Sequence, residues 1–269
     1  MPSRRKLVAG GLCTLGVGAT ITTCGVAAQL EPDVRALCLT GLGIEAGLAL
    51  IALAGALLSS RPVSDGLGLV RSRLSLSKLL LVVIGTLALS HALDSLLSLS
   101  GLREHSALAR FDALLAGVRA GDLALAVLAL AVAPAFGEEL LCRGWIQRGL
   151  QPRLGAGRAV AIAALIFGLL HLDPIHALFA IFLGLYLGTI ACWAGSTWPG
   201  IVCHGVNNAL AVVIAAGLLP SLPLDLPGVV LGMGLAGAAL WAVRPSGAAA
   251  ESDAQGPSSL QEQPRSDDP

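Results

Sequence analysis

Apolar residues in this chain form long continuous runs, and short polar segments separate one run from the next. A helix needs roughly 20 consecutive, mostly apolar residues to cross a lipid bilayer. Runs of this kind predict membrane-spanning helices near residues 7–28, 36–58, 79–99, 122–141, 159–172, 175–194, 198–219 and 224–243. The fifth run is short and ends at the polar sequence HLDP, so we expect its helix to stop part-way across the membrane or to be buried in the bundle. The pattern therefore predicts an all-α fold, a polytopic transmembrane bundle of about eight helices.

The composition excludes a soluble globular domain. Of 269 residues, 55% are hydrophobic and only 13% are charged, and the mean hydropathy is +0.80. A soluble domain of this length would need more charged residues to cover its surface, so the expected surroundings are a lipid bilayer. The formal net charge is +0, which gives no support for nucleic-acid binding.

The two ends of the chain predict an anchor and a polar tail. The first apolar run follows Arg4, Arg5 and Lys6 and favours a retained membrane anchor, although a cleavable signal has a similar pattern. Residues 244–269 are rich in Pro, Ser, Gly and acidic residues, which is typical of a disordered tail. The six cysteines form no CxxC pair, and we assign no disulfide.

Lysine and arginine residues in the loops predict the orientation, because cytoplasmic loops carry an excess of both. The cationic start of the chain, the loop after the second run and the loop after the fourth run all fall on one side. We therefore expect both termini in the cytoplasm and, from the Ala- and Arg-rich, Lys-poor composition, a bacterial inner (cell) membrane. The 100–121 segment, with Arg103, Arg110 and Arg119, is an exception on the opposite side.

Ionisable groups inside apolar runs are candidates for function because they are costly in a membrane. The first cluster is Glu138, Glu139 and Arg143, in the sequence FGEELLCRGW. Glu139 and Arg143 are four residues apart, so on a helix they share a face and can pair. Glu138 points about 100° away and lacks that partner. An unpaired carboxylate in an apolar site suits general-base catalysis.

Two further groups carry imidazoles. In FGLLH, Phe167 and His171 share a helix face, and in HGVNN, His204 and Asn208 do so. Together with Glu138 they supply a base, two imidazoles and an amide donor. This set can activate a water and stabilise an oxyanion, which peptide-bond hydrolysis requires.

EELLCR, FGLLH and HGVNN resemble, in this order, the three motifs of the CAAX-protease and bacteriocin-processing (CPBP, Abi) family, which includes the type II CAAX prenyl endopeptidases. The resemblance extends over residues 122–219. It implies an intramembrane glutamic-type endopeptidase that acts on membrane-associated proteins or peptides. The roles it implies are water activation by Glu138 with His171, oxyanion stabilisation by His204 and Asn208, and support of the motif helix by Glu139 and Arg143. Phe167 is a supporting residue, and no cofactor is implied.

Other interpretations remain open. Glu139 and Arg143 also fit a structural ion pair. His171, Asp173 and His176 also fit a metal site, with zinc as the metal. Cys142, four residues from Glu138, is expected to be a filler residue, although a thiol beside a base can also be a nucleophile.

The sequence thus predicts four parts. Residues 1–120 are membrane helices of unassigned role, 121–220 a protease core, 221–243 a last membrane helix and 244–269 the tail. The expected function is that of a membrane-embedded endopeptidase. The alternatives are a catalytically idle membrane scaffold or bacteriocin-immunity protein, and a small proton-coupled transporter.

Overall fold

The computed structural model describes residues 33–245, and this part of the chain is helical, without strands. The first predicted run, near 7–28, and the predicted tail from 246 onward lie outside the described residues. In chain order the helices are α2 (Val34–Leu57), α3 (Val63–Gly66), α4 (Leu76–Leu99), η1 (Arg103–His105), α5 (Ala107–Leu115), α6 (Ala120–Val127), η2 (Leu128–Val132), α7 (Ala133–Glu139), η3 (Leu140–Gln147), α8 (Arg148–Leu154), α9 (Ala156–Leu169), α10 (Pro174–Ala194), α11 (Trp198–Ala215) and α12 (Leu226–Val243). The predicted all-α fold is confirmed.

Six helices of the described residues are long and apolar enough to cross a membrane: α2, α4, the continuous helix Ala120–Leu154, α10, α11 and α12. The helix Ala120–Leu154 extends well beyond the run expected to end at 141. The more polar segment after 141 keeps a helical backbone. The helix ends at Gly155, whose φ of 77° is not helical. The shorter α9 has 14 residues. It is roughly 21 Å long at 1.5 Å per residue, too short to cross the hydrocarbon core, as its sequence predicts.

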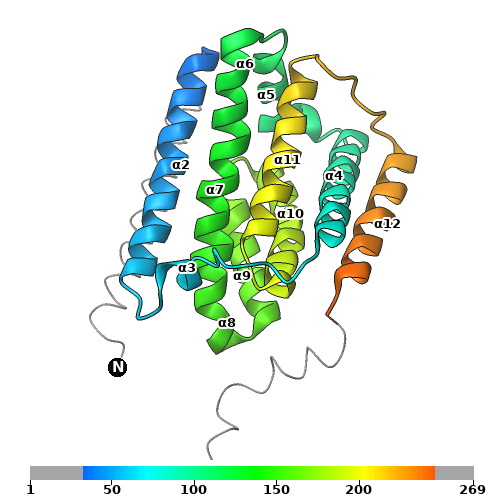
Figure 1. The fold of residues 1–269 in the computed structure, drawn as a ribbon. Coiled ribbons are helices and arrows are strands. Elements are labelled where there is room, and N and C mark those ends of the chain that lie inside the picture. The colour runs from blue at the N-terminus through cyan, green and yellow to red at the C-terminus, as the bar shows by residue number, and fades with distance from the viewer. Residues whose placement is uncertain (1–32, 246–269) are drawn as a thin grey trace, which may run out of the picture.

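The long helices stand side by side from α2 through α7 and α11 to α4 and α12 (Figure 1). Helix α10 packs against α9, α11 and α4. Three helices begin at a residue whose side chain accepts a hydrogen bond from the backbone N–H three residues later: Ser75 for α4, Asp173 for α10 and Asp225 for α12. These caps place the helix starts where the polar loops meet the apolar runs.

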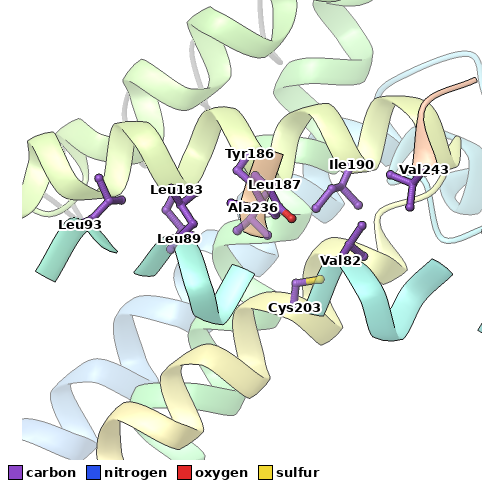
Figure 2. Packing of buried hydrophobic residues seen from close by; sticks show 10 residues of the cluster. All are labelled: Val82, Leu89, Leu93, Leu183, Tyr186, Leu187, Ile190, Cys203, Ala236 and Val243. Atoms are coloured by element: carbon purple, nitrogen blue, oxygen red, sulfur yellow. The ribbon is translucent and has the colours of Figure 1, made fainter. Parts of the chain in front are cut away.

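The main apolar core lies where α4, α10, α11 and α12 meet (Figure 2). Its members are Val82, Leu89, Leu93, Leu183, Tyr186, Leu187, Ile190, Cys203, Ala236 and Val243. A second apolar cluster joins α2 to the long helix and to α9 and α10. Leu141 and Cys142 of η3 belong to this second cluster, which packs η3 against α2 and α9.

The cations at the two ends of the bundle differ in their partners. At one end Arg148 donates to the backbone carbonyls of Asp65 (3.1 Å) and Gly195 (3.2 Å), which brings the loops beside α3, α8 and α10 together. At the other end, where the exceptional 100–121 segment lies, Arg103 forms ion pairs of 2.6 and 2.7 Å with Asp94 and Asp112. Two carboxylates therefore offset the positive charge of Arg103 in the 100–121 segment, the exception to the expected orientation.

Candidate active site

The long helix carries the first polar cluster where its α-helical part α7 passes into the π-helical segment η3. Arg143 Nη1 lies 2.7 Å from Glu139 Oε1, and both side chains are fully buried. The predicted pairing of these two residues is confirmed. Such π-helical turns within long helices are frequent at functional sites.

Helix α11 places His204 against both glutamates. Its Nδ1 lies 3.2 Å from Glu139 Oε1, and its Nε2 lies 3.7 Å from Glu138 Oε2. The second distance is too long for a direct hydrogen bond. Glu138 Oε2 is buried and has no hydrogen-bond partner. Glu138 is thus adjacent to the imidazole but not bound to it.

Asn208 fixes the tautomer of His204. Its Nδ2 lies 3.1 Å from His204 Nε2, and because an amide nitrogen only donates, this imidazole nitrogen accepts. The proton of a neutral His204 is then on Nδ1, which donates to Glu139. The same geometry confirms that Asn208, rather than its neighbour Asn207, faces the imidazole.

A proline in the long helix provides the anchor for Asn208. Pro134 has no backbone N–H, so the carbonyl of Leu130, one turn earlier, lacks its usual helical partner. Asn208 Nδ2 donates to that carbonyl at 3.2 Å. The π-helical segment η2 ends two residues before this proline. The local break in the helix therefore positions the amide on α11.

Phe167 on α9 lies between the two imidazoles. Its ring centroid is 5.7 Å from that of His204 and 5.2 Å from that of His171, and both contacts are edge-to-face. His171 Nδ1 lies 2.9 Å from the Phe167 carbonyl, so the imidazole donates there and keeps Nε2 as an acceptor. Between these described residues there is no hydrogen bond or ion pair from His171 to Glu138. His171 therefore joins the cluster through Phe167.

Helix α10 holds η3 in place through a pair of parallel contacts. Arg143 Nη2 donates to the Gly184 carbonyl at 3.2 Å, and Gln147 Nε2, one turn further, donates to the Gly188 carbonyl at 2.9 Å. The guanidinium also lies 4.2 Å from the centroid of the Phe167 ring. These contacts orient Arg143, and through it Glu139 and His204.

The residues weighed for a metal site or a thiol nucleophile have other surroundings. The ring of His171 lies 4.4 Å from that of His176, but the carboxylate of Asp173 accepts from the His176 backbone N–H and caps α10. Within residues 33–245, no group of three or more potential ligands is placed to hold a metal ion. Cys142 is buried in the apolar cluster around Phe167.

One carboxylate in this region was missed by the sequence analysis. Glu45, in the middle of α2, is only 8% exposed and packs against Gly137. It is the single acidic residue of a 24-residue apolar helix. The principle that flagged Glu138 would have found it, because an ionisable residue within a membrane span marks a functional candidate.

The comparisons agree with the three motifs. Residues 120–210 match the family model of the type II CAAX prenyl endopeptidase Rce1-like proteins. This segment is similar to the Rce1-like family. The match includes every residue assigned to the site from the sequence and excludes Glu45. The resemblance to the CAAX-protease and bacteriocin-processing family is thereby confirmed.

The Rce1-like family is a protease family, which supports peptidase activity of this chain in general terms. Together with the six apolar helices, the match identifies an integral membrane protein. A membrane protease implies a protein or peptide substrate at the membrane. No curated protein and no solved structure matches the chain.

Proposed function

We propose that this chain hydrolyses a peptide bond in a membrane-associated protein or peptide, with a water activated by Glu138. The observation that carries the proposal is that Glu138 lies next to His204 in a buried site. Asn208 and Glu139 hold the His204 imidazole in a single tautomer. Two separate helices supply these groups. A purely structural ion pair between Glu139 and Arg143 needs neither His204 nor Asn208.

The distance between Glu138 and His204 suits a shared water. Two atoms 3.7 Å apart can both contact one water oxygen about 2.8 Å from each. In the proposed reaction Glu138 takes a proton from that water while the oxygen attacks the substrate carbonyl. Glu138 then gives the proton to the leaving amine nitrogen. Hydroxide is added to the acyl carbon and a proton to the amine, with no covalent intermediate.

His204 and Asn208 are proposed to bind the oxyanion. Asn208 shifts one N–H from His204 Nε2 to the developing oxygen, while its other N–H stays on the Leu130 carbonyl. His204 takes up one proton from solvent at Nε2 as the substrate binds, donates it in a hydrogen bond to the oxyanion, and returns it to solvent when the product leaves. The carboxylate of Glu139 at Nδ1 stabilises this positive imidazole, as a buried carboxylate does in other hydrolytic triads.

His171 is proposed to assist at the substrate side of Glu138. Its Nδ1 is committed to the Phe167 carbonyl, so the Nε2 lone pair is available to a substrate or water. Its side chain is only partly buried, at the turn where α9 ends. We propose that this turn, part-way across the bundle, admits the substrate from the membrane.

We propose that the site lies in the cytoplasmic half of the inner membrane of a bacterium. His204 is the seventh residue of α11, roughly 9 Å from the start of that helix at 1.5 Å per residue. The helix starts at the end where Arg148 joins the cation-bearing loops, which the positive-inside pattern places in the cytoplasm.

The test is cleavage by the purified protein in proteoliposomes. The probes are an internally quenched farnesylated CAAX peptide, its unprenylated counterpart and a tryptic survey of new chain ends in native membranes. We expect Glu138→Gln and His204→Ala to abolish cleavage, with at least about a 100-fold loss of kcat. His176→Ala is the matched control, since it removes an imidazole whose ring meets those of His171 and Phe179 edge-to-face.

Two outcomes would decide against the proposal. Normal processing by both Glu138→Gln and His204→Ala would leave the idle scaffold or the transporter as the better explanation. Loss of activity in excess EDTA, restored by zinc alone, would replace the carboxylate-activated water with a metal-activated one.

A further inference from the structure

The carboxylate of Glu45 is a buried acidic group that the proposed mechanism leaves unused. Its Oε2 is buried and has no hydrogen-bond partner. An ionised carboxylate in the middle of a membrane span is costly unless another group satisfies it. The buried Glu45 carboxyl group therefore needs a neighbouring group that satisfies it, and no ion pair with a cation does so.

Glu45 packs directly on the helix that carries the motif glutamates. A Cβ atom at Gly137 would meet Glu45 Oε2 and would lie 2.7 Å from the Glu45 backbone carbonyl. Gly137 immediately precedes Glu138 in the chain. The absence of a side chain at Gly137 thus lets α2 bring a second carboxyl group beside Glu138.

The charged groups around Glu45 leave Glu138 as its electrostatic partner. The elements that pack most extensively on α2 are α3, α6, η2, α7 and η3, and α9, α10 and α11 share apolar clusters with it. The charged side chains of the first five elements are Asp65, Asp122, Glu138, Glu139 and Arg143, and α2 itself adds Arg35. Arg35 is paired with Asp122 and Arg143 with Glu139. Glu138 follows Gly137, the residue that Glu45 contacts, and its Oε2 also has no hydrogen-bond partner.

Two buried carboxyl groups without a cation cannot both be ionised at low cost, and such pairs hold one proton between them. We propose that Glu45 is a positioning residue that shares a proton with Glu138 and holds the Glu138 carboxylate toward His204. This inference rests on the proposed function. Glu45 donates while Glu138 is the base, so the shared proton keeps the two groups in contact without a salt bridge.

The first test is independent of activity. Infrared difference spectra in H2O and D2O report protonated carboxyl groups in the purified protein. We expect a protonated carboxyl band at neutral pH in the wild type, and we expect Glu45→Gln to remove it. A band that persists unchanged in Glu45→Gln, or its absence from the folded wild type, would overturn the proposal.

The second test is the pH profile of cleavage of the farnesylated probe. Loss of the shared proton at high pH makes both carboxyls negative, so activity falls there. Glu45→Gln removes this ionisation, and the alkaline limb moves to higher pH. Glu45→Leu cannot donate, and we expect kcat to fall about tenfold with little change in KM. Leu48→Met, one turn further along α2 and in an apolar cluster, is the control.

The outcomes separate the two proposals. An alkaline limb at the same pH in Glu45→Gln, or a kcat for Glu45→Leu equal to that of Leu48→Met, would refute the role of Glu45 alone. Full activity of Glu138→Gln would refute the proposed function, whereas the infrared band would still report the carboxyl pair.

Discussion

The buried pair between Arg143 and Glu139 makes a stability prediction that can be worked out from its contacts. Arg143→Met leaves the Glu139 carboxylate without its cation, in a site where both side chains are 0% exposed. Breaking a buried ion pair by removal of one partner costs about 3–5 kcal/mol. His204 Nδ1 remains 3.2 Å from that carboxylate and offsets part of the loss. We therefore expect the lower end, about 3 kcal/mol, or more than about 100-fold in the folding equilibrium.

Gln147→Leu is the matched control for this change. Gln147 is fully buried on the same helical segment and donates to an α10 carbonyl, as Arg143 does, but it carries no charge. Its loss is expected to cost about 1 kcal/mol, the net value of one hydrogen bond. The difference between the two variants then measures the charge of Arg143 apart from its contact with α10.

The assay is reversible unfolding in mixed detergent and SDS micelles, followed by tryptophan fluorescence. The double variant Arg143→Met with Glu139→Gln removes both charges, so it should recover at least half of the stability that Arg143→Met loses. Equal destabilisation by Arg143→Met and Gln147→Leu would refute this reasoning, because it would show that the buried charge contributes nothing beyond a hydrogen bond.

Two further predictions follow from single contacts, and a third follows from the charges of the loops. Gly137→Ala should destabilise the protein by about 1–3 kcal/mol because its Cβ would meet Glu45, whereas Gly149→Ala, with nothing within 4 Å, should be neutral or stabilising in the same unfolding assay. Asn208→Ala should lower kcat about 100-fold, while Asn207→Ala, which loses only a bond to Asn208, should lose less than about tenfold in probe cleavage. A green fluorescent protein inserted between α8 and α9 should fluoresce, and one inserted between α5 and α6 should not; the reverse would invert the proposed orientation.

The apolar runs predicted most of the fold, because bilayer thickness alone fixes how long a spanning helix must be. The run expected at 175–194 is the helix Pro174–Ala194, and the shortness of α9 was also expected. Continuity was harder to predict: the helix expected at 122–141 runs to Leu154. Hydropathy reports where a chain leaves the apolar region, and a helix can continue past that point.

Within the candidate site, contacts along one helix were predictable and contacts between helices were not. Helical spacing was enough for Glu139 with Arg143 and for His204 with Asn208, which are both four residues apart. The bond from His204 to Glu139 depends on how α11 crosses the long helix, and no spacing in the sequence encodes that crossing. The same limit applies to Glu45, which lies outside the three motifs.

Glycines explain how this bundle buries so many polar side chains. A Cβ atom at Gly137, Gly188 or Gly200 would meet a polar side chain from a neighbouring helix, which is Glu45, Gln147 and Glu139 respectively. Small residues let membrane helices approach closely, and here they also leave room for a carboxylate or an amide away from lipid. Each of these three buried polar groups is therefore specified twice, once by its own position and once by a glycine on another helix. On this reasoning the glycine of FGEELLCR is part of the site, because it makes room for the carboxyl group that α2 brings beside Glu138.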